Sequence, residues 1–137
     1  MRGHLPQTDV RELTAVFLGG LLGSLGRVGL AQAFPHAAAA WPWPTFAVNL
    51  LGALVLGWAV VRLPPAGYGR PFVGIGVCGA LTTFATLQLE LLRMLDAGEL
   101  PRALLYAAAS LAGGLVCVRL GLALGASGRR RETGRPA

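Results

Sequence analysis

Four long stretches without a charged side chain dominate this sequence. No Asp, Glu, Lys or Arg occurs in residues 13–26, 28–61, 71–89 or 103–118. Charged residues make up 13% of the chain, against about 25% in an ordinary soluble domain. This leaves too little polar surface to cover a globule in water, and a disordered chain would be poor in apolar residues. The sequence therefore predicts a protein whose main solvent is lipid.

The charge-free stretches predict four membrane-spanning helices, because a bilayer core about 30 Å thick needs roughly 20 apolar residues per helix. Pro35, Pro42 and Pro44 divide the longest stretch between two spans, since proline breaks a helix interior. Extending each stretch to the flanking charges gives spans at about 11–33, 45–63, 71–95 and 101–124. We expect an all-α membrane protein with a short tail (1–10), one four-helix transmembrane domain (11–125) and a basic tail (126–137).

The arginines predict how the chain is oriented in the membrane. All 12 basic residues are arginine, and most lie at Arg2 and Arg11, at Arg62 and Arg70, or in 129–135. With four spans, these three regions share one side, which the positive-inside rule makes the cytoplasm. We therefore expect a multi-pass protein of the cell membrane with both termini in the cytoplasm. The net charge of +6 then needs no nucleic-acid partner.

Small residues predict how the helices pack. Lipid gives helices no hydrophobic drive to associate, so close contact between small residues and interhelical hydrogen bonds must hold them together. The chain has 20 glycines, and those on the first, second and fourth spans include Gly19, Gly20, Gly23, Gly26, Gly52, Gly113, Gly114, Gly121 and Gly125. Four such helices enclose little interior, so we also expect an oligomer.

Polar side chains at membrane depth must find a partner or water. Asn49 lies near the start of the second span, with Thr45 one turn earlier on the same face. Tyr106 and Ser110 share a face of the fourth span. A hydroxyl can bond the backbone carbonyl one turn back, whereas the Asn49 amide has more donors than a helix backbone can use. Asn49 therefore indicates an interhelical bond or a polar path.

The third span contains the most unusual segment, residues 74–87, in which glycines precede paired threonines. These residues weaken the helix where a spanning segment most needs its internal hydrogen bonds. A break is tolerated there if the freed groups face protein, water or an ion. Converging carbonyl oxygens would suit a hard cation such as sodium. The alternative is an unbroken helix whose threonines bond back to it.

Several motifs together resemble one known family. The glycine-rich run that ends in Thr82-Thr83-Phe84 is the most specific of them. The others are Gly19-Gly20-x-x-Gly23-x-x-x-Arg27, Thr45-x-x-Val48-Asn49-x-x-Gly52 and Tyr106-x-x-x-Ser110. In this order and with four spans, the chain resembles the CrcB/Fluc fluoride channels.

The resemblance implies a dual-topology-type dimer of antiparallel subunits with two fluoride pathways. It implies a structural sodium ion, not transported, on the backbone carbonyls of Gly79 and Thr82 from both subunits. It also places Arg27 in the aqueous vestibule. The residues implied for the fluoride pathway are Thr45, Asn49, Thr83, Phe84, Tyr106 and Ser110. Flow would be passive and outward, exporting cytoplasmic fluoride and so reducing its toxicity.

The sequence departs from the family pattern at Leu87, where a second phenylalanine is usual, at Ala85, where serine is common, and at Gly114, where a hydroxyl is often found. Methyl groups cannot present the positive edge of an aromatic ring. A subunit that inserts both ways should also show little charge bias, whereas this chain is strongly biased. Both points favour a heterodimer with a related subunit of opposite orientation over a homodimer.

Two other functions fit a small four-helix membrane protein. A drug/proton antiporter normally needs an intramembrane carboxylate, and the candidate here is Glu90. A non-conducting structural subunit would account for the glycines but not for Asn49 beside a broken helix. We do not expect an enzyme, because the spans carry no cluster of His, Asp, Glu or Cys spaced for acid-base or metal chemistry.

Overall fold

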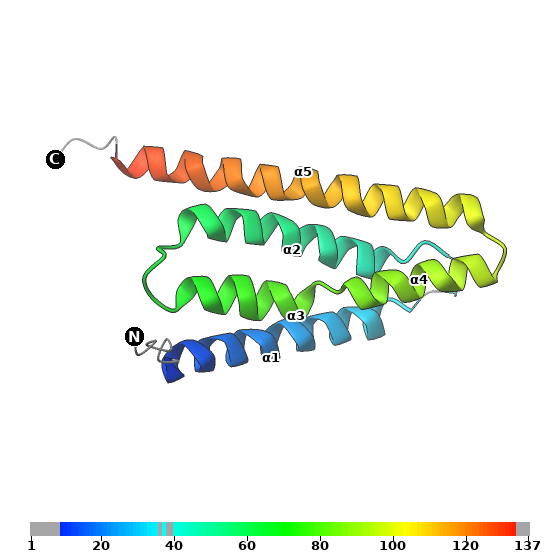
Figure 1. Cartoon of the computed structure of the whole chain (residues 1–137), viewed down its shortest axis with the longest axis horizontal. Coiled ribbons are helices and arrows are strands. Elements are labelled where there is room, and N and C mark those ends of the chain that lie inside the picture. The colour runs from blue at the N-terminus through cyan, green and yellow to red at the C-terminus, as the bar shows by residue number, and fades with distance from the viewer. Residues whose placement is uncertain (1–8, 36, 38–39, 134–137) are drawn as a thin grey trace, which may run out of the picture.

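The computed structural model describes the backbone of residues 9–35, 37 and 40–133, and the side chains of these residues as far as 128. Its described residues form helices and connecting segments without a strand, so the expected all-α fold is confirmed. In chain order (Figure 1) the elements are α1 (Val10–Ala33), α2 (Trp43–Arg62), the π-helical η1 (Pro71–Cys78), α3 (Gly79–Leu81), α4 (Phe84–Asp96) and α5 (Leu100–Thr133).

Four segments are long and apolar enough to cross a membrane, which confirms the expected layout of four spans. They are Val10–Ala33, Trp43–Arg62, Pro71–Asp96 and Leu100–Gly128. The third combines η1, α3 and α4. Helix α5 continues past the predicted end of the fourth span because nothing in 125–133 breaks it. Its 34 residues at about 1.5 Å each make it about 50 Å long, more than a bilayer core.

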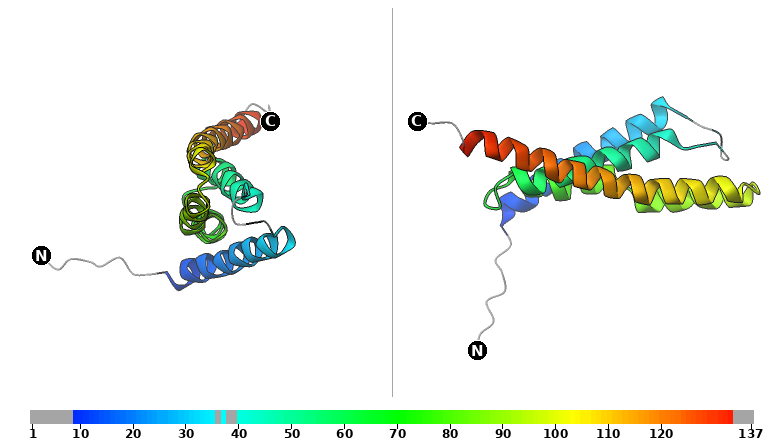
Figure 2. Two further views of the ribbon diagram at one scale, coloured as in Figure 1. Left: turned by 90° about the vertical axis from the view of Figure 1, so that its right-hand side faces the viewer. Right: turned by 90° about the horizontal axis from the view of Figure 1, so that it is seen from above.

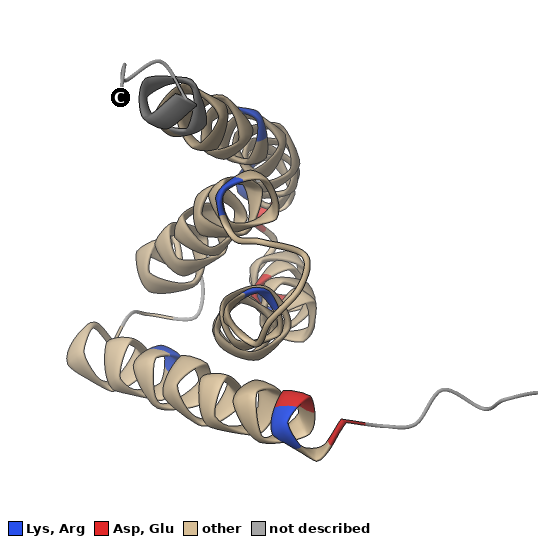
Figure 3. Ribbon diagram, turned by 90° about the vertical axis from the view of Figure 1, so that its left-hand side faces the viewer, with Lys and Arg blue, Asp and Glu red and all other residues tan. Residues whose placement is uncertain are grey.

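The helices form an open stack rather than a closed ring. Along Figure 1 the order is α5, α2, then α3 with α4, then α1. Helix α5 packs along α2, and α1 packs along η1 and α3. End views place α1 and α5 at opposite edges (Figures 2 and 3), and these two helices share no contact among the described residues.

One end of the stack gathers the start of α1, the loop 63–70 and the end of α5 (Figure 1). This is the end that Figure 3 turns toward the viewer. There the Tyr68 hydroxyl donates to Asp9 Oδ2 at 3.0 Å, and Asp9 also caps α1 by accepting from the Arg11 amide. The bond to a carboxylate raises the pKa of Tyr68. These contacts link the loop to α1.

Glycines allow the closest approaches between helices, as predicted. A side chain on Gly121 of α5 would collide with the Leu54 carbonyl oxygen, and one on Gly57 would collide with that of Val118. Gly19 and Gly23 give α1 the same closeness to η1. By contrast, a β-carbon placed on Gly20 or Gly114 would meet nothing within 4 Å. Those two glycines therefore face away from neighbouring helices of this subunit.

The interior of the subunit is small. Buried hydrophobic residues among those described are Val48, Ala59, Cys78, Leu87, Met94, Ala103 and Tyr106. Large apolar side chains along α1 and α5 are exposed instead, including Phe17 at 70% and Leu111 at 70%. Water would be a poor solvent for such faces. The packing therefore supports the multi-pass membrane assignment.

Candidate functional site

The third span breaks at Thr82 and Thr83. Both residues adopt extended backbone angles, with ψ of 146° at Thr82 and φ and ψ of −148° and 118° at Thr83. Helix α3 ends at Leu81 and α4 begins at Phe84. The predicted break is confirmed, and the alternative of an unbroken helix is wrong. Back-bonding does occur at Thr82, whose hydroxyl donates to the Cys78 carbonyl at 2.8 Å.

Asn49 of α2 is bonded directly to this break. The Thr83 N–H donates to Asn49 Oδ1 at 2.9 Å, and Asn49 Nδ2 donates to the Thr83 carbonyl at 3.4 Å. The Asn49 amide thus forms hydrogen bonds with both backbone groups of Thr83, a residue that lies outside the helices. The predicted interhelical bond is confirmed. Gly52, one turn further along α2, leaves room for the Thr82 methyl group.

The break frees the two carbonyls that were predicted to bind sodium. In a continuous helix the Gly79 carbonyl would accept from the amide of Thr83, and the Thr82 carbonyl from that of Thr86. Here the Thr83 amide donates to Asn49, and the Thr86 amide donates to Thr83 Oγ1 at 3.2 Å. Both oxygens are therefore free of their regular helical partners, which is what a carbonyl ligand requires.

Arg27 of α1 supports the other side of the break. Its Nε donates to the Ala80 carbonyl at 3.2 Å, so a third carbonyl near the end of α3 has a charged partner. Arg27 also lines a cavity of about 140 Å³ together with Thr45, Thr83 and Thr86. The guanidinium therefore brings positive charge to a small, hydroxyl-bearing cavity next to the break.

A second cavity, of about 290 Å³, lies between α2, α5 and the first half of the third span. Asn49, Gly79 and Thr82 are among its lining residues. The bonded pair Asn49 and Thr83 therefore has one member in each cavity. The structure thus brings together six of the predicted site residues around the break: Arg27, Thr45, Asn49, Gly79, Thr82 and Thr83.

Tyr106 and Ser110 lie apart from these cavities, on α5. Tyr106 is fully buried and packs against Trp41 and Phe46, with ring centroids 5.2 and 6.2 Å away. The hydroxyls of Tyr106 and Ser110 are buried and find no hydrogen-bond partner among the described residues. Back-bonding to the helix, the simple alternative, is therefore wrong for Ser110.

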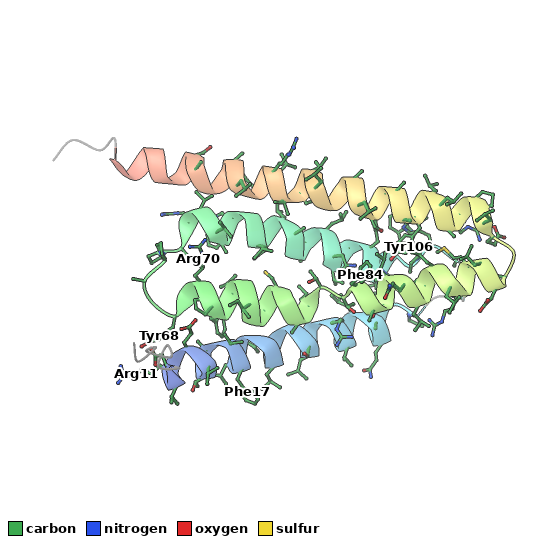
Figure 4. All side chains as sticks on the ribbon, viewed as in Figure 1. Arg11, Phe17, Tyr68, Arg70, Phe84 and Tyr106 are labelled. Carbon is green, nitrogen blue, oxygen red and sulfur yellow. The ribbon has the colours of Figure 1, made fainter. Side chains whose placement is uncertain are left out.

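Phe84 and Leu87 face different surroundings although they are only three positions apart on α4. Phe84 is 69% exposed and lies beside the gap between α3 and α4 (Figure 4). Leu87 is 8% exposed and belongs to the buried cluster with Met94 and Tyr106. The ring predicted for the pathway thus points out of the subunit, while the position that departs from the family pattern fills its core.

Carboxylates at depth are scarce in the described part of the chain. Glu90 is buried, and its Oε1 lies 3.7 Å from Arg93 Nη1 on the same helix. No group of three or more His, Cys, Asp or Glu residues gathers within the described ranges. The break therefore offers a cation backbone oxygens rather than side-chain ligands, and the carboxylate that an antiporter would use lies in an ion pair.

Sequence reasoning missed two features of this region. The bond from Arg27 to Ala80 joins residues 53 apart in the chain, and no local pattern predicts it. Trp41 was also overlooked, although a tryptophan followed directly by Pro42 and the second span was a usable signal. Its indole Nε1 is buried and finds no hydrogen-bond partner among the described residues.

Comparison with known proteins gives consistent matches. The sequence profile of a family described as "CrcB-like protein, Camphor Resistance (CrcB)" matches residues 14–122. "Fluoride-specific ion channel FluC 1" of Mycolicibacterium paratuberculosis is 47% identical over 120 residues, covering 85% of this chain and 91% of the relative. Its namesake in Mycobacterium tuberculosis is 44% identical (88% and 94% covered), and "Fluoride-specific ion channel FluC" of Thermus thermophilus is 43% identical (85% and 94% covered).

Proposed function

The chain belongs to the CrcB-like family, and from this membership we propose that it forms a fluoride-specific channel that passively exports fluoride from the cytoplasm. Relatives along most of its length are named ion channels, so its role is transport rather than catalysis. The observation that carries the proposal is the broken third span tied to Asn49. The names of the relatives do not favour the antiporter or the structural subunit.

The chemistry of fluoride fits the polar groups near the break. Fluoride is small and strongly hydrated, so a pathway through lipid must replace its water with donors. The Asn49 amide and the hydroxyls of Thr45 and Thr83 are such groups beside the cavities. Arg27 adds a positive charge that would draw an anion toward the same place. Arg27 is the residue that we place in the aqueous vestibule of the proposed channel.

The second part of the proposed pathway consists of Phe84, Tyr106 and Ser110. An aromatic edge carries partial positive charge, so the outward ring of Phe84 suits an anion that passes between subunits. The unpartnered hydroxyls of Tyr106 and Ser110 can each turn a proton toward an acceptor. These features support a row of weak donors that fluoride could follow.

A structural sodium ion would fit the carbonyls of Gly79 and Thr82. Both oxygens have lost their helical amides, and sodium would supply the positive charge that such carbonyls need. Two subunits that face each other at this point would contribute four oxygens. Exchange of sodium for a larger cation should then weaken the pairing of subunits, which the mass of the detergent-solubilised assembly measures.

The proposed assembly is an antiparallel dimer, for which the open stack and the exposed Phe84 provide support. We favour a heterodimer because the arginines give this subunit one preferred orientation. Both termini would lie in the cytoplasm, and the protein in the cell membrane. The partner would then be a related subunit of opposite orientation. It would carry a phenylalanine at the position that Leu87 occupies in this chain.

Fluoride efflux from liposomes tests the proposal. Vesicles loaded with potassium fluoride are mixed with valinomycin, and a fluoride electrode records release. Fast efflux is expected from the assembly, alone or with the related subunit, and chloride-loaded vesicles should release little. Fast fluoride efflux from this subunit alone would overturn the heterodimer but keep the channel. Absence of fluoride efflux both from this subunit alone and from its mixture with the related subunit would reject the channel itself.

A further inference from the structure

Trp41 anchors an aromatic cluster at the end of the stack opposite the chain termini. It precedes α2 and is held there by the Trp43 amide, which donates to the Trp41 carbonyl at 2.9 Å. Its ring meets Tyr106 and Phe46 edge to face, with centroids 5.2 and 5.5 Å away. The indole therefore wedges between the start of α2 and helix α5.

This cluster contains an unusual concentration of unsatisfied polar atoms. Trp41 Nε1, Tyr106 Oη and Ser110 Oγ are all buried without a hydrogen-bond partner among the described residues. A buried polar group left without a partner destabilises a protein, and native structures contain few of them. These three atoms, one on Trp41 and two one turn apart on α5, are groups that a shared hydrogen-bonding ligand would satisfy.

The chemistry of the three groups selects the class of ligand. An indole N–H can donate but cannot accept, and each hydroxyl can rotate to donate as well. A ligand that accepts from all three can be an anion or a neutral oxygen, and the proposed channel function selects fluoride. A cation or a hydrogen-bond donor would gain nothing from the indole N–H.

We propose that the Trp41 indole N–H donates a hydrogen bond to fluoride, at the end of the row that Tyr106 and Ser110 form. This inference rests on the proposed channel function and adds a specificity-determining residue to it. The N–H replaces part of the water that fluoride gives up near the end of the stack where α2 begins. Trp41 is thus the first fixed donor of the row at that end of the stack.

The test compares three variants in the fluoride efflux assay, using whichever assembly conducts. Trp41→Phe removes the N–H and some volume. Trp41 replaced by 3-benzothienylalanine keeps the bicyclic shape and removes the N–H. Trp43→Phe is the matched control, because Trp43 touches Phe46 in the same cluster, at 6.1 Å between ring centroids, but is 65% exposed.

Both changes at Trp41 should slow fluoride efflux about tenfold, as expected for the loss of a hydrogen bond to a charged group. The control should stay within about twofold of the wild type. Wild-type efflux from the benzothienylalanine protein would overturn the inference, whether or not Trp41→Phe is slow, because shape and not the N–H would then matter. If the wild type itself conducts no fluoride in either composition, the channel proposal fails and this inference fails with it.

Discussion

Replacing Asn49 with leucine should release the break in the third span from α2. Leucine is similar in size, but it can neither accept from the Thr83 N–H nor donate to the Thr83 carbonyl. The bond of 2.9 Å is an ordinary one, whereas that of 3.4 Å is weak. A buried amide left without a partner costs roughly 1–3 kcal/mol. Taking about 2 kcal/mol, local opening around Thr83 becomes about 30-fold more frequent.

Hydrogen exchange at the Thr83 amide measures this opening directly, and fluoride efflux measures its consequence. Asn49→Leu should exchange about 30-fold faster at this amide than the wild type and should conduct poorly. Asn49→Asp is the matched comparison, because its carboxylate oxygen can still accept from the Thr83 N–H. Exchange should then lie between that of the wild type and that of Asn49→Leu, because the weak bond to the Thr83 carbonyl is lost, while the negative charge repels fluoride and lowers efflux.

The two variants separate support of the break from lining of the pathway. Wild-type exchange in Asn49→Leu would refute the view that this side chain holds the Thr83 backbone. Fast exchange together with wild-type efflux would show that conduction does not depend on a fixed break. Unchanged efflux in Asn49→Asp would remove Asn49 from the proposed pathway.

Three further predictions follow from packing and charge. Gly121→Ala forces a methyl group against the Leu54 carbonyl oxygen and should destabilise the protein by about 1–3 kcal/mol. Gly114→Ala has open space around the new methyl group and should leave the stability unchanged. Equal shifts in the thermal unfolding of the two variants would contradict this. Leu87→Phe enlarges a buried core residue and should also cost about 1–3 kcal/mol in denaturant unfolding; a variant of unchanged stability with faster fluoride efflux would show that the new ring had reached the pathway. Asp9→Asn should lower the raised pKa of Tyr68 toward its usual 10.0, because the phenolate no longer forms beside a carboxylate; an unchanged tyrosinate absorbance titration would exclude that cause.

The spans and the break could be predicted because they depend on local properties of the chain. Charge-free length sets where a helix can cross lipid, and glycine with paired threonine lowers helix propensity at one place. Asn49 was predictable as an interhelical donor, since an amide at depth needs partners beyond its own helix. Its actual partner, the backbone of Thr83, was not predictable, because it depends on how α2 is rotated and shifted against the third span.

Features that depend on helix rotation were out of reach of the sequence. The resemblance implied an aromatic ring at position 84 and usually another at position 87, yet the rotation of α4 exposes Phe84 and buries Leu87. The bond between Arg27 and Ala80 requires α1 to lie along α3. The unsatisfied indole of Trp41 required knowing which polar atoms the aromatic cluster covers.

The broken helix is stabilised within one subunit, and this constrains how an assembly could form. Asn49 accepts a hydrogen bond from the Thr83 N–H, and Arg27 donates one to the Ala80 carbonyl. The Thr83 hydroxyl caps α4 by accepting from the Thr86 N–H. These three contacts come from α2, α1 and α4, so each half of the third span is held before any partner arrives. The groups that remain available to an ion or a partner subunit are the carbonyls of Gly79 and Thr82 and the ring of Phe84. A defect at Asn49 therefore acts on the folding of the subunit itself, whereas a defect at Phe84 would act on the proposed pathway between subunits.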